Sequence, residues 1–496
     1  MSIGALKENL LLVLPLAFVC GLACVMMMLS INVELLDQDE DIYALVAIDL
    51  LSGRMPFQGV FDHKPIGVYY LYAAMFSIFG ESFVSIRLMT ISLLMGTAIC
   101  IYLGLSALNF SKKSKLAAVA TVLAFPIGLS GLAGNTEVMQ SFFLSTIFLT
   151  ISILKIGSLK KSWLLLVLYG LMVALGFSVN YLFSLLGLFS YIAYTFFVLM
   201  FEKVGFRQFF LDSFLIFIGF LLGMVLIYSP YLYDYVIGGN LLQSYLVDQG
   251  IFLSGYRYDI SKTRIIERVF VWIIPFLPII IAGSFISREE KSSRWMVMLF
   301  ACATLLSALV AACMSLSFFH HYWILATVPL ALIAALSIDK RGSNRVSNRV
   351  VGLSLSAGLF LYMISGSEMI VNHYLNNSEG REFHNALGFL EENIGAGEPV
   401  AVIGASPVYP YLGKMKIDQK YVFPNHVSKL HAKGVIDGDA YYLDTLSNNK
   451  RYALMSPTIC DSERYTDTCM FLFENFQEIG SFTGYHPFVV YKRISK

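Results

Sequence analysis

The feature that most constrains this chain is a succession of apolar segments, each long enough to cross the hydrocarbon core of a membrane, which is about 30 Å thick. About eleven such segments can be delimited. They lie at residues 9–31, 83–108, 116–134, 138–156, 162–179, 182–201, 208–231, 269–287, 295–316, 322–338 and 350–371. With 57% hydrophobic and only 14% charged residues, the chain is far from the composition of soluble domains. The sequence predicts an all-α polytopic membrane domain, and the net charge of +1 gives no sign of a nucleic-acid partner.

The charges between these segments predict an orientation. Lysine and arginine gather in every second connection, at Lys7 and within residues 112–115, 155–161, 203–207, 288–294 and 340–349. By the positive-inside rule these connections are cytoplasmic, so we expect the N-terminus inside and the C-terminus outside. The first apolar segment lacks a small-residue cleavage site, and we interpret it as a retained span.

The first outer loop, residues 32–82, concentrates charged side chains beside the membrane, where they are costly unless they have a function. Two short helical patterns, at residues 39–51 and 66–79, are too short to cross the membrane. We expect both to be interfacial helices, joined by a loop that carries His63 and Lys64.

Further polar residues fall at the outer ends of other segments. Glu137 follows Asn135-Thr136 at the start of a span, and His320, His321 and Tyr322 open another. The longest outer loop, residues 233–268, carries Tyr256, Arg257 and Tyr258. No internal repeat or inverted symmetry is visible.

Composition becomes ordinary near residue 372, so we divide the chain into a transmembrane domain, 1–371, and a soluble extracytoplasmic α/β domain, 372–496. In the latter, Ser378 to Gly395 has a helical pattern, and residues 399–404, 452–455 and 488–491 have strand patterns. Cys460 and Cys469 are expected to form a disulfide outside the cytoplasm, with unlinked thiols as the alternative. The five cysteines in apolar segments are expected to be buried thiols.

The outer loop and the span ends contain a series of short motifs: Asp39-Glu40-x-x-Tyr43, Gly53, Pro56, Phe61-Asp62-His63-Lys64-Pro65, Phe79-Gly80 and Arg87-Leu88, followed by Asn135-Thr136-Glu137 and by His321-Tyr322 with Pro329. In this combination they resemble the GT-C glycosyltransferases of the ArnT and protein-O-mannosyltransferase-like group. The resemblance covers the membrane core and only loosely the tail domain. It implies an enzyme of a bacterial inner membrane that takes a sugar from a polyprenyl-phosphate carrier and passes it to an envelope glycan, lipid or protein.

Carried over residue by residue, the resemblance makes Asp39 the essential acid, Lys64 the donor-phosphate lysine and Glu137 a second acid. Glu40 joins them as a catalytic candidate. His63 replaces the glutamate of the aminoarabinose enzymes, so that sugar is in doubt. The expected substrate pocket contains Tyr43, His63, Tyr256, Tyr258, His321 and Tyr322.

Sugar transfer from a phosphate carrier would explain why a few cations lie in the outer loops, against the positive-inside rule. Transfer of the sugar leaves a phosphate monoester, whose charge Lys64, Arg87 and Arg257 can neutralise. Asp39 can accept the proton of an attacking hydroxyl, which is typically worth about 10²- to 10⁴-fold in rate. A single displacement with inversion is the expected outcome.

Other interpretations stay open at this point. Lys64 can be a snorkelling lysine, Asp39 a helix cap and Glu137 a charge that suits a helix dipole. No cofactor is firmly implied, although Asp39, Glu40, His63 and Glu137 have the chemistry to gather a divalent cation. Rival functions are a flippase or transporter of the same lipid-linked sugar, and an envelope polysaccharide polymerase or ligase.

Overall fold

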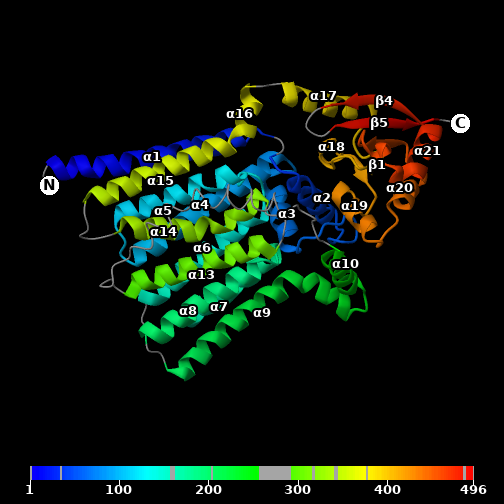
Figure 1. Ribbon diagram of the computed structural model, residues 1–496. Helices are drawn as coiled ribbons and strands as arrows, with labels where there is room; N and C mark the ends of the chain where they lie inside the picture. Colours follow the sequence, from blue (N-terminus) through cyan, green and yellow to red (C-terminus); the bar gives the residue numbers. More distant parts are fainter. Residues whose placement is uncertain are drawn as a thin grey trace. The chain divides into compact units, whose positions relative to one another are not determined.

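A computed structural model describes residues 3–33, 36–156, 162–202, 205–255, 292–314, 319–339, 345–375, 378–448, 450–483 and 487–494. This part of the chain is mostly helical and contains one small sheet (Figure 1). Its residues divide into two compact units. The helical unit comprises Met1–Val33, Ile86–Ser229 and Arg257–Ile370, and the α/β unit comprises Glu34–Ser85, Pro230–Tyr256 and Val371–Lys496. The predicted fold class is confirmed.

The helical unit is built from apolar helices. Those that lie wholly or mainly in it are α1 (Ile3–Ser30), α4 (Phe83–Ala107), α5 (Lys112–Ala124), α6 (Thr136–Ile156), α7 (Ser162–Val179), α8 (Phe183–Phe197), α9 (Phe206–Val236), α13 (Ser292–Met314), α14 (Thr327–Ile338) and α15 (Arg345–Gly366). Among the described residues, seven helices are long and apolar enough to cross a membrane.

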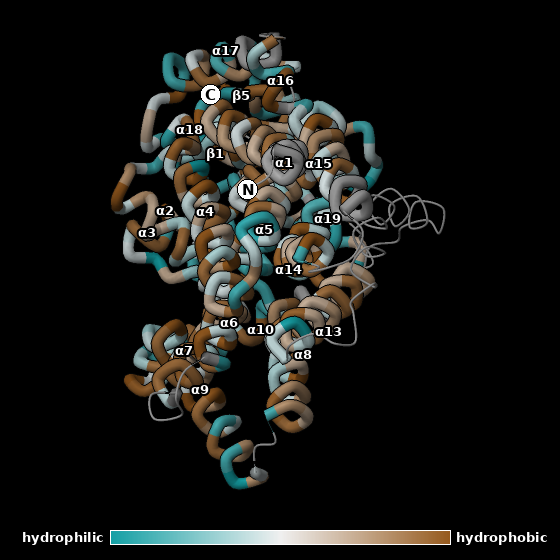
Figure 2. The backbone as a smooth tube through the Cα atoms, turned by 90° about the vertical axis from the view of Figure 1, so that its left-hand side faces the viewer, coloured by the Kyte–Doolittle hydropathy of each residue, from teal (hydrophilic) through white to brown (hydrophobic). Residues whose placement is uncertain are grey.

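Burial separates lipid-facing helices from central ones. Only 17% of the most apolar window of α9 is buried, whereas the window His320–Ile338, which contains α14, is wholly buried. Figure 2 shows the apolar colouring along α9. α14 packs against α5 and α13. The exposed apolar side chains of α9 therefore suit contact with lipid, while α14 forms the core of the unit.

Two predicted spans are not single α-helices. In the predicted span 116–134, α5 ends at Ala124 and a 3₁₀ turn, Pro126–Leu129, follows, because proline lacks the N–H that would continue the helix. The predicted span 322–338 begins as a 3₁₀ segment, His320–Ala326, before α14. The predicted span 269–287 lies outside the described residues, so the number of spans stays a prediction.

The α/β unit contains the first outer loop as well as the tail. Its helices are α2 (Asp39–Leu51), α3 (Gly67–Phe79), α10 (Leu241–Gly255), α16 (Glu368–Leu375, which begins in the helical unit), α17 (Ser378–Asn393), α18 (Val408–Leu412), α19 (Pro424–Ala432), α20 (Gly438–Ser447) and α21 (Thr466–Asn475). The two short helices predicted in the outer loop are thus present as α2 and α3, which pack against each other.

The sheet has five strands in the order β2-β1-β3-β5-β4, with bounds β1 (Pro399–Ile403), β2 (Lys416–Ile417), β3 (Tyr452–Met455), β4 (Phe476–Phe482) and β5 (Phe488–Arg493). β1 lies parallel to both β2 and β3, and β5 lies antiparallel to β3 and β4. All four residues of β3 and residues 400–403 of β1 are buried, as is typical of strands covered on both faces.

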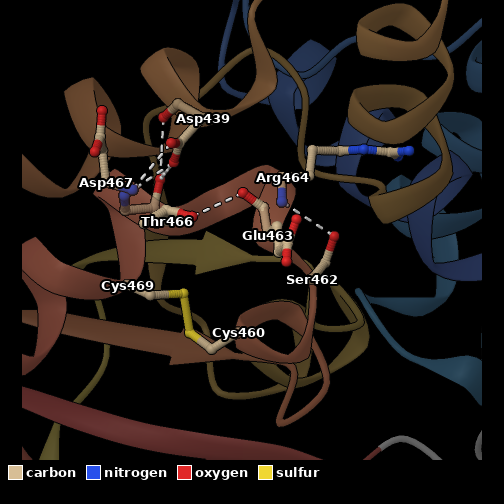
Figure 3. Close-up of a disulfide and its surroundings, with 9 residues drawn as sticks. Asp439, Cys460, Ser462, Glu463, Arg464, Thr466, Asp467 and Cys469 are labelled. Atoms are coloured by element: carbon tan, nitrogen blue, oxygen red, sulfur yellow. Dashed lines mark hydrogen bonds between the residues drawn. A yellow bond between two sulfur atoms is a disulfide. The ribbon is translucent and has the colours of Figure 1, made fainter.

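A disulfide joins Cys460 and Cys469 beside the start of α21 (Figure 3). There the Asp439 carboxylate accepts hydrogen bonds from the backbone N–H groups of Asp467 and Thr468, at 3.0 and 2.9 Å. These bonds satisfy donors that the first turn of α21 leaves open.

The other five cysteines, at positions 20, 24, 100, 302 and 313, are free. Cys24, Cys302 and Cys313 are exposed on the protein surface. Cys20 and Cys100 are half-buried. The prediction that all five are buried is therefore wrong, because an apolar helix that faces lipid needs no protein cover for a thiol.

Candidate active site

Helix α2 begins with three acids in its first turn, and each has a different environment. Asp39 accepts a hydrogen bond of 3.0 Å from the Tyr43 hydroxyl, one turn further along. Glu40 is fully buried and accepts from the backbone N–H of Leu36 at 3.2 Å. The positive end of the helix dipole favours negative charge at all three positions.

Asp41 is also fully buried, and its carboxylate accepts a hydrogen bond of 2.9 Å from the Ser406 hydroxyl. Burial raises the pKa of Asp41 well above its usual value. Burial therefore favours the neutral form of the Asp41 carboxyl over its charged form.

The loop between α2 and α3 is fixed by Asp49. Its carboxylate accepts from the backbone N–H of Val60 at 2.9 Å and forms an ion pair with Arg54. The Tyr231 hydroxyl donates to the carbonyl of Pro56 at 2.9 Å. These bonds fix the conformation of the loop, and with it the position of the residues that follow Val60.

Asp62 is the centre of a buried polar network. Its carboxylate is 3.0 Å from His63 Nδ1 and accepts from the Tyr69 hydroxyl at 2.9 Å. Burial by itself raises the pKa of Asp62, but the adjacent His63 and Lys64 lower it well below its usual value. Asp62 is thus ionised. The Tyr69 ring connects Asp62 to Asp39 through Tyr43, because the Tyr69 and Tyr43 ring centroids are 6.4 Å apart and the Tyr43 hydroxyl donates to Asp39.

Lys64 is predicted to bind the donor phosphate, and its side chain is nearly fully buried. The Tyr69 hydroxyl and the Gln249 side chain both reach its carbonyl oxygen, at 3.2 and 3.5 Å. Lys64 and Asp39 therefore lie in the same compact unit, on segments joined by the Tyr43 and Tyr69 rings. Burial of this side chain argues against a snorkelling lysine, whose ammonium reaches water. Phosphate binding by Lys64 stays a prediction.

Helix α19 of the tail brings two basic side chains to this network. The backbone N–H of Phe61 donates to the carbonyl of Lys420 at 2.7 Å, ahead of α19. His426 Nε2 lies 3.5 Å from the Asp62 carboxylate, and burial lowers the pKa of His426 to about 3. One turn later, burial lowers the pKa of Lys429 to about 7, against the opposing effect of the Asp39 carboxylate.

Asp62, His63 and His426 can hold a metal ion. Their ligand atoms all lie within 4.8 Å of one another, and two imidazoles with a carboxylate suit a transition metal such as zinc. Of the four residues that the sequence suggested for a divalent cation, Asp39, Glu40, His63 and Glu137, only His63 belongs to this group. The group's second histidine comes from the tail.

Other predicted site residues lie in the helical unit. Glu137 is buried at the start of α6 and lies 3.5 Å from Asn180 Nδ2. Arg87 is fully buried and donates to the carbonyls of Val33 and Leu132, at 3.3 and 3.4 Å. The His321 and Tyr322 rings meet edge to face with centroids 4.8 Å apart. Roles for these residues in substrate binding stay predictions.

Three predicted site residues, Tyr256, Arg257 and Tyr258, lie outside the described residues. Three others were missed by the sequence reasoning as functional residues: Asp62, His426 and Lys429. Asp62 stood in the matched Phe61-to-Pro65 segment without a role. His426 and Lys429 carry a faint signal, because they lie one turn apart on a helix that opens with Pro424.

Comparison with known proteins agrees with this architecture. The family described as dolichyl-phosphate-mannose-protein mannosyltransferase matches residues 63–233. ArnT from Cupriavidus metallidurans in the apo state is similar at a TM-score of 0.64 with 12% identity, over 96% of this chain and 97% of that one. The same protein bound to undecaprenyl phosphate is similar at a TM-score of 0.63 with 13% identity, over 97% of this chain and 98% of that one.

Arabinofuranosyltransferase AftD from Mycobacteria is similar at a TM-score of 0.54 with 13% identity, over 97% of this chain and 41% of that one. A search of curated proteins gave no match. This chain therefore shares the fold of these solved membrane proteins, as the resemblance stated from its sequence implies. The family model, which covers residues 63–233, agrees with that resemblance.

Proposed function

We propose that this protein is an integral-membrane glycosyltransferase that moves a sugar from a polyprenyl-phosphate donor of undecaprenyl type to a hydroxyl of an envelope glycan, lipid or protein. The reaction takes place on the extracytoplasmic side of a bacterial inner membrane. One observation carries the proposal: a single compact unit holds Asp39 together with the cations Lys64 and Lys429. The undecaprenyl phosphate bound to ArnT supports the choice of carrier.

The reaction is a displacement at the anomeric carbon. Asp39 accepts the proton of the acceptor hydroxyl while its oxygen forms the new bond, and the bond from the anomeric carbon to the phosphate oxygen breaks. The electron pair leaves with that oxygen, which gives polyprenyl phosphate and a product of inverted configuration. The Tyr43 hydroxyl, 3.0 Å from the Asp39 carboxylate, orients this base.

Charge develops on the leaving phosphate, and fixed cations stabilise it most where water is excluded. Lys64 and Lys429 supply this charge from the α/β unit, where the Lys64 residue and the Lys429 ammonium are buried. As the sequence predicts, Arg87 and Arg257 are also proposed to bind donor phosphate, and Glu137 to orient the acceptor. His63, next to Asp62 and Lys64, is proposed to contact the donor sugar.

The test uses the purified full-length protein with an undecaprenyl-phosphate sugar and measures released undecaprenyl phosphate together with transfer to envelope acceptors. We expect release by the wild-type protein. Asp39→Asn is expected to lower the rate about 10²- to 10⁴-fold, and Lys64→Ala is expected to lower it about 10²-fold or more, as the loss of one stabilising group does.

Glu392→Gln, at an exposed acid of α17, is the matched control and should keep the wild-type rate. Full activity in Asp39→Asn with folding intact contradicts the assignment of the base. Movement of the lipid-linked sugar across vesicles without release of carrier favours a flippase instead.

A further inference from the structure

The sheet of the α/β unit contains a point where chain connections diverge. β1 lies between β2 and β3, and the three strands are parallel. After β1 the chain passes through α18 to β2 on one side, whereas after β3 it passes through α21 to β4 and β5 on the other. In open α/β sheets, ligands bind in the crevice that such divergence opens at the carboxyl ends of the strands.

A pocket of about 250 Å³ lies at this point. The last residues of β1 and β3, Ile403 and Met455, are direct partners, so the two strands end side by side. The segment that follows β1 and the residue that follows β3 both line the pocket. Its complete lining is Gln38, Gly404, Ala405, Ser406, Pro407, Phe423, Pro424, Ser456 and Pro487.

The chemistry of the lining fits an uncharged sugar. None of the lining residues is charged, so the lining offers no ion pair to a phosphate. Gln38, Ser406 and Ser456 supply hydrogen-bond donors and acceptors for hydroxyls, while the Phe423 ring and the prolines supply flat apolar surfaces for the carbon face of a sugar ring. A pocket that combines a few polar groups with apolar walls is typical of small-molecule sites.

The pocket is connected to the first turn of α2. Gln38 lines it and directly precedes Asp39. From the segment after β1, the Ser406 hydroxyl donates to the Asp41 carboxylate at 2.9 Å. A molecule held in the pocket is therefore next to the turn that carries the proposed base, within one compact unit.

We propose that this pocket binds a neutral saccharide unit of the acceptor and directs one of its hydroxyl groups toward Asp39. This inference rests on the proposed glycosyltransferase function and adds to it the class of acceptor, a glycan or glycolipid with an uncharged sugar at the site of attachment. Donor and acceptor then have separate sites, the first cationic and the second neutral.

The test fills the pocket. Ser456→Trp places a large ring in it, and Pro487→Trp does so from another residue of the wall. Thr458→Trp is the matched control, because Thr458 is exposed on the same turn, does not line the pocket and shares a hydroxyl contact of 3.1 Å with Ser456. The full-length protein in detergent is probed by saturation-transfer NMR with methyl glucoside, methyl galactoside, methyl mannoside and methyl N-acetylglucosaminide.

We expect saturation transfer to at least one glycoside with the wild-type protein and Thr458→Trp, and its loss in both pocket variants. In transfer assays the pocket variants should raise the KM for the acceptor at least tenfold and leave undecaprenyl phosphate binding unchanged. The proposal is overturned if the wild-type protein shows no saturation transfer to any of the four glycosides. It is also overturned if saturation transfer persists in Ser456→Trp.

The proposed glycosyltransferase function and the proposed acceptor pocket are tested by different measurements. Undecaprenyl phosphate binding by the wild-type protein tests the proposed function without the pocket. If the carrier does not bind, the glycosyltransferase function fails. If the carrier binds and is released from its sugar while the glycosides do not bind, only the acceptor pocket fails.

Discussion

At the scale of single residues, the two proposed phosphate-binding lysines of the α/β unit differ in origin. Lys64 follows the Asp62-His63 pair in the first outer loop, and Lys429 comes from the tail. Burial lowers the pKa of Lys429 to about 7, so this ammonium loses its proton in the physiological range. If Lys429 binds the leaving phosphate as proposed, its titration makes the rate of sugar transfer depend on pH.

The first prediction concerns this lysine. As pH rises through about 7, Lys429 becomes neutral, and we expect the wild-type transfer rate to fall because the leaving phosphate loses a stabilising charge. Lys429→Arg should move the falling limb to higher pH, because a guanidinium stays protonated. Lys429→Gln should lower the rate about 10²-fold at pH 6. A wild-type profile that stays flat to pH 9 would contradict the role of Lys429.

The second prediction concerns Asp41. Because its pKa is raised on folding, the folded state binds more protons than the unfolded state above about pH 4, and wild-type stability falls as pH rises. Asp41→Asn removes this loss and can still accept a hydrogen bond from Ser406. We expect Tm in detergent to be roughly 2 °C or more above that of the wild-type protein at pH 8, with the difference shrinking toward pH 4. A Tm below the wild-type value at pH 8 would show that Asp41 is needed as a carboxylate.

At the scale of secondary-structure elements, apolar pattern and capping residues predicted most of the helices. The patterns at 39–51 and 66–79 correspond to α2 and α3, and the one that opens at Ser378 corresponds to α17. Prediction from these patterns failed where a local feature interrupts them. Pro126 divides the predicted span 116–134, and β2 is only two residues long, too short to leave a period-2 signal.

The candidate site was predictable only in part. Asp39, Lys64 and His63 come from one loop, and a local motif can identify them together. Their partners His426 and Lys429 lie more than 350 residues further along the chain, and no pattern in a single sequence says which helix of the tail faces that loop. Contacts across such a separation follow from tertiary packing, which periodicity does not encode.

The ends of several helices of the helical unit meet at one acid. Asp339, just after α14, accepts from the backbone N–H of Ser111 at 2.9 Å, from the Ser114 hydroxyl at 3.1 Å and from Arg294 Nε at 2.9 Å. Arg294 also donates to the carbonyl of Leu108 at 2.9 Å. This ion pair is largely buried and connects α4, α5, α13 and α14.

The third prediction therefore concerns Asp339. Asp339→Ala leaves the Arg294 charge buried without its carboxylate, and we expect a loss of stability of about 3–5 kcal/mol. The double variant Asp339→Leu with Arg294→Met should be more stable than Asp339→Ala, because it leaves no unpaired charge. Thermal unfolding in detergent measures both. Equal Tm values for Asp339→Ala and the wild-type protein would show that the pair contributes nothing.

At the scale of the whole molecule, charge and disulfide chemistry point to the same orientation. The connections rich in lysine and arginine alternate with connections that carry few cations. The Cys460–Cys469 disulfide lies in the tail, and disulfides persist in oxidising compartments outside the cytoplasm. An extracytoplasmic tail also fits a reaction on a lipid carrier whose sugar is presented outside. The orientation follows from these arguments and stays a prediction.

The fourth prediction tests this orientation with fused reporters. Alkaline phosphatase joined after Lys496 should be active in a bacterial host, because it folds only where its disulfides form. Green fluorescent protein at the same point should stay dark if it is exported unfolded. The two results should reverse for fusions within residues 340–344, which carry Lys340 and Arg341 and are expected to be cytoplasmic. A fluorescent fusion after Lys496 with an inactive phosphatase there would place the tail in the cytoplasm, away from the proposed acceptors, and would exclude the proposed function.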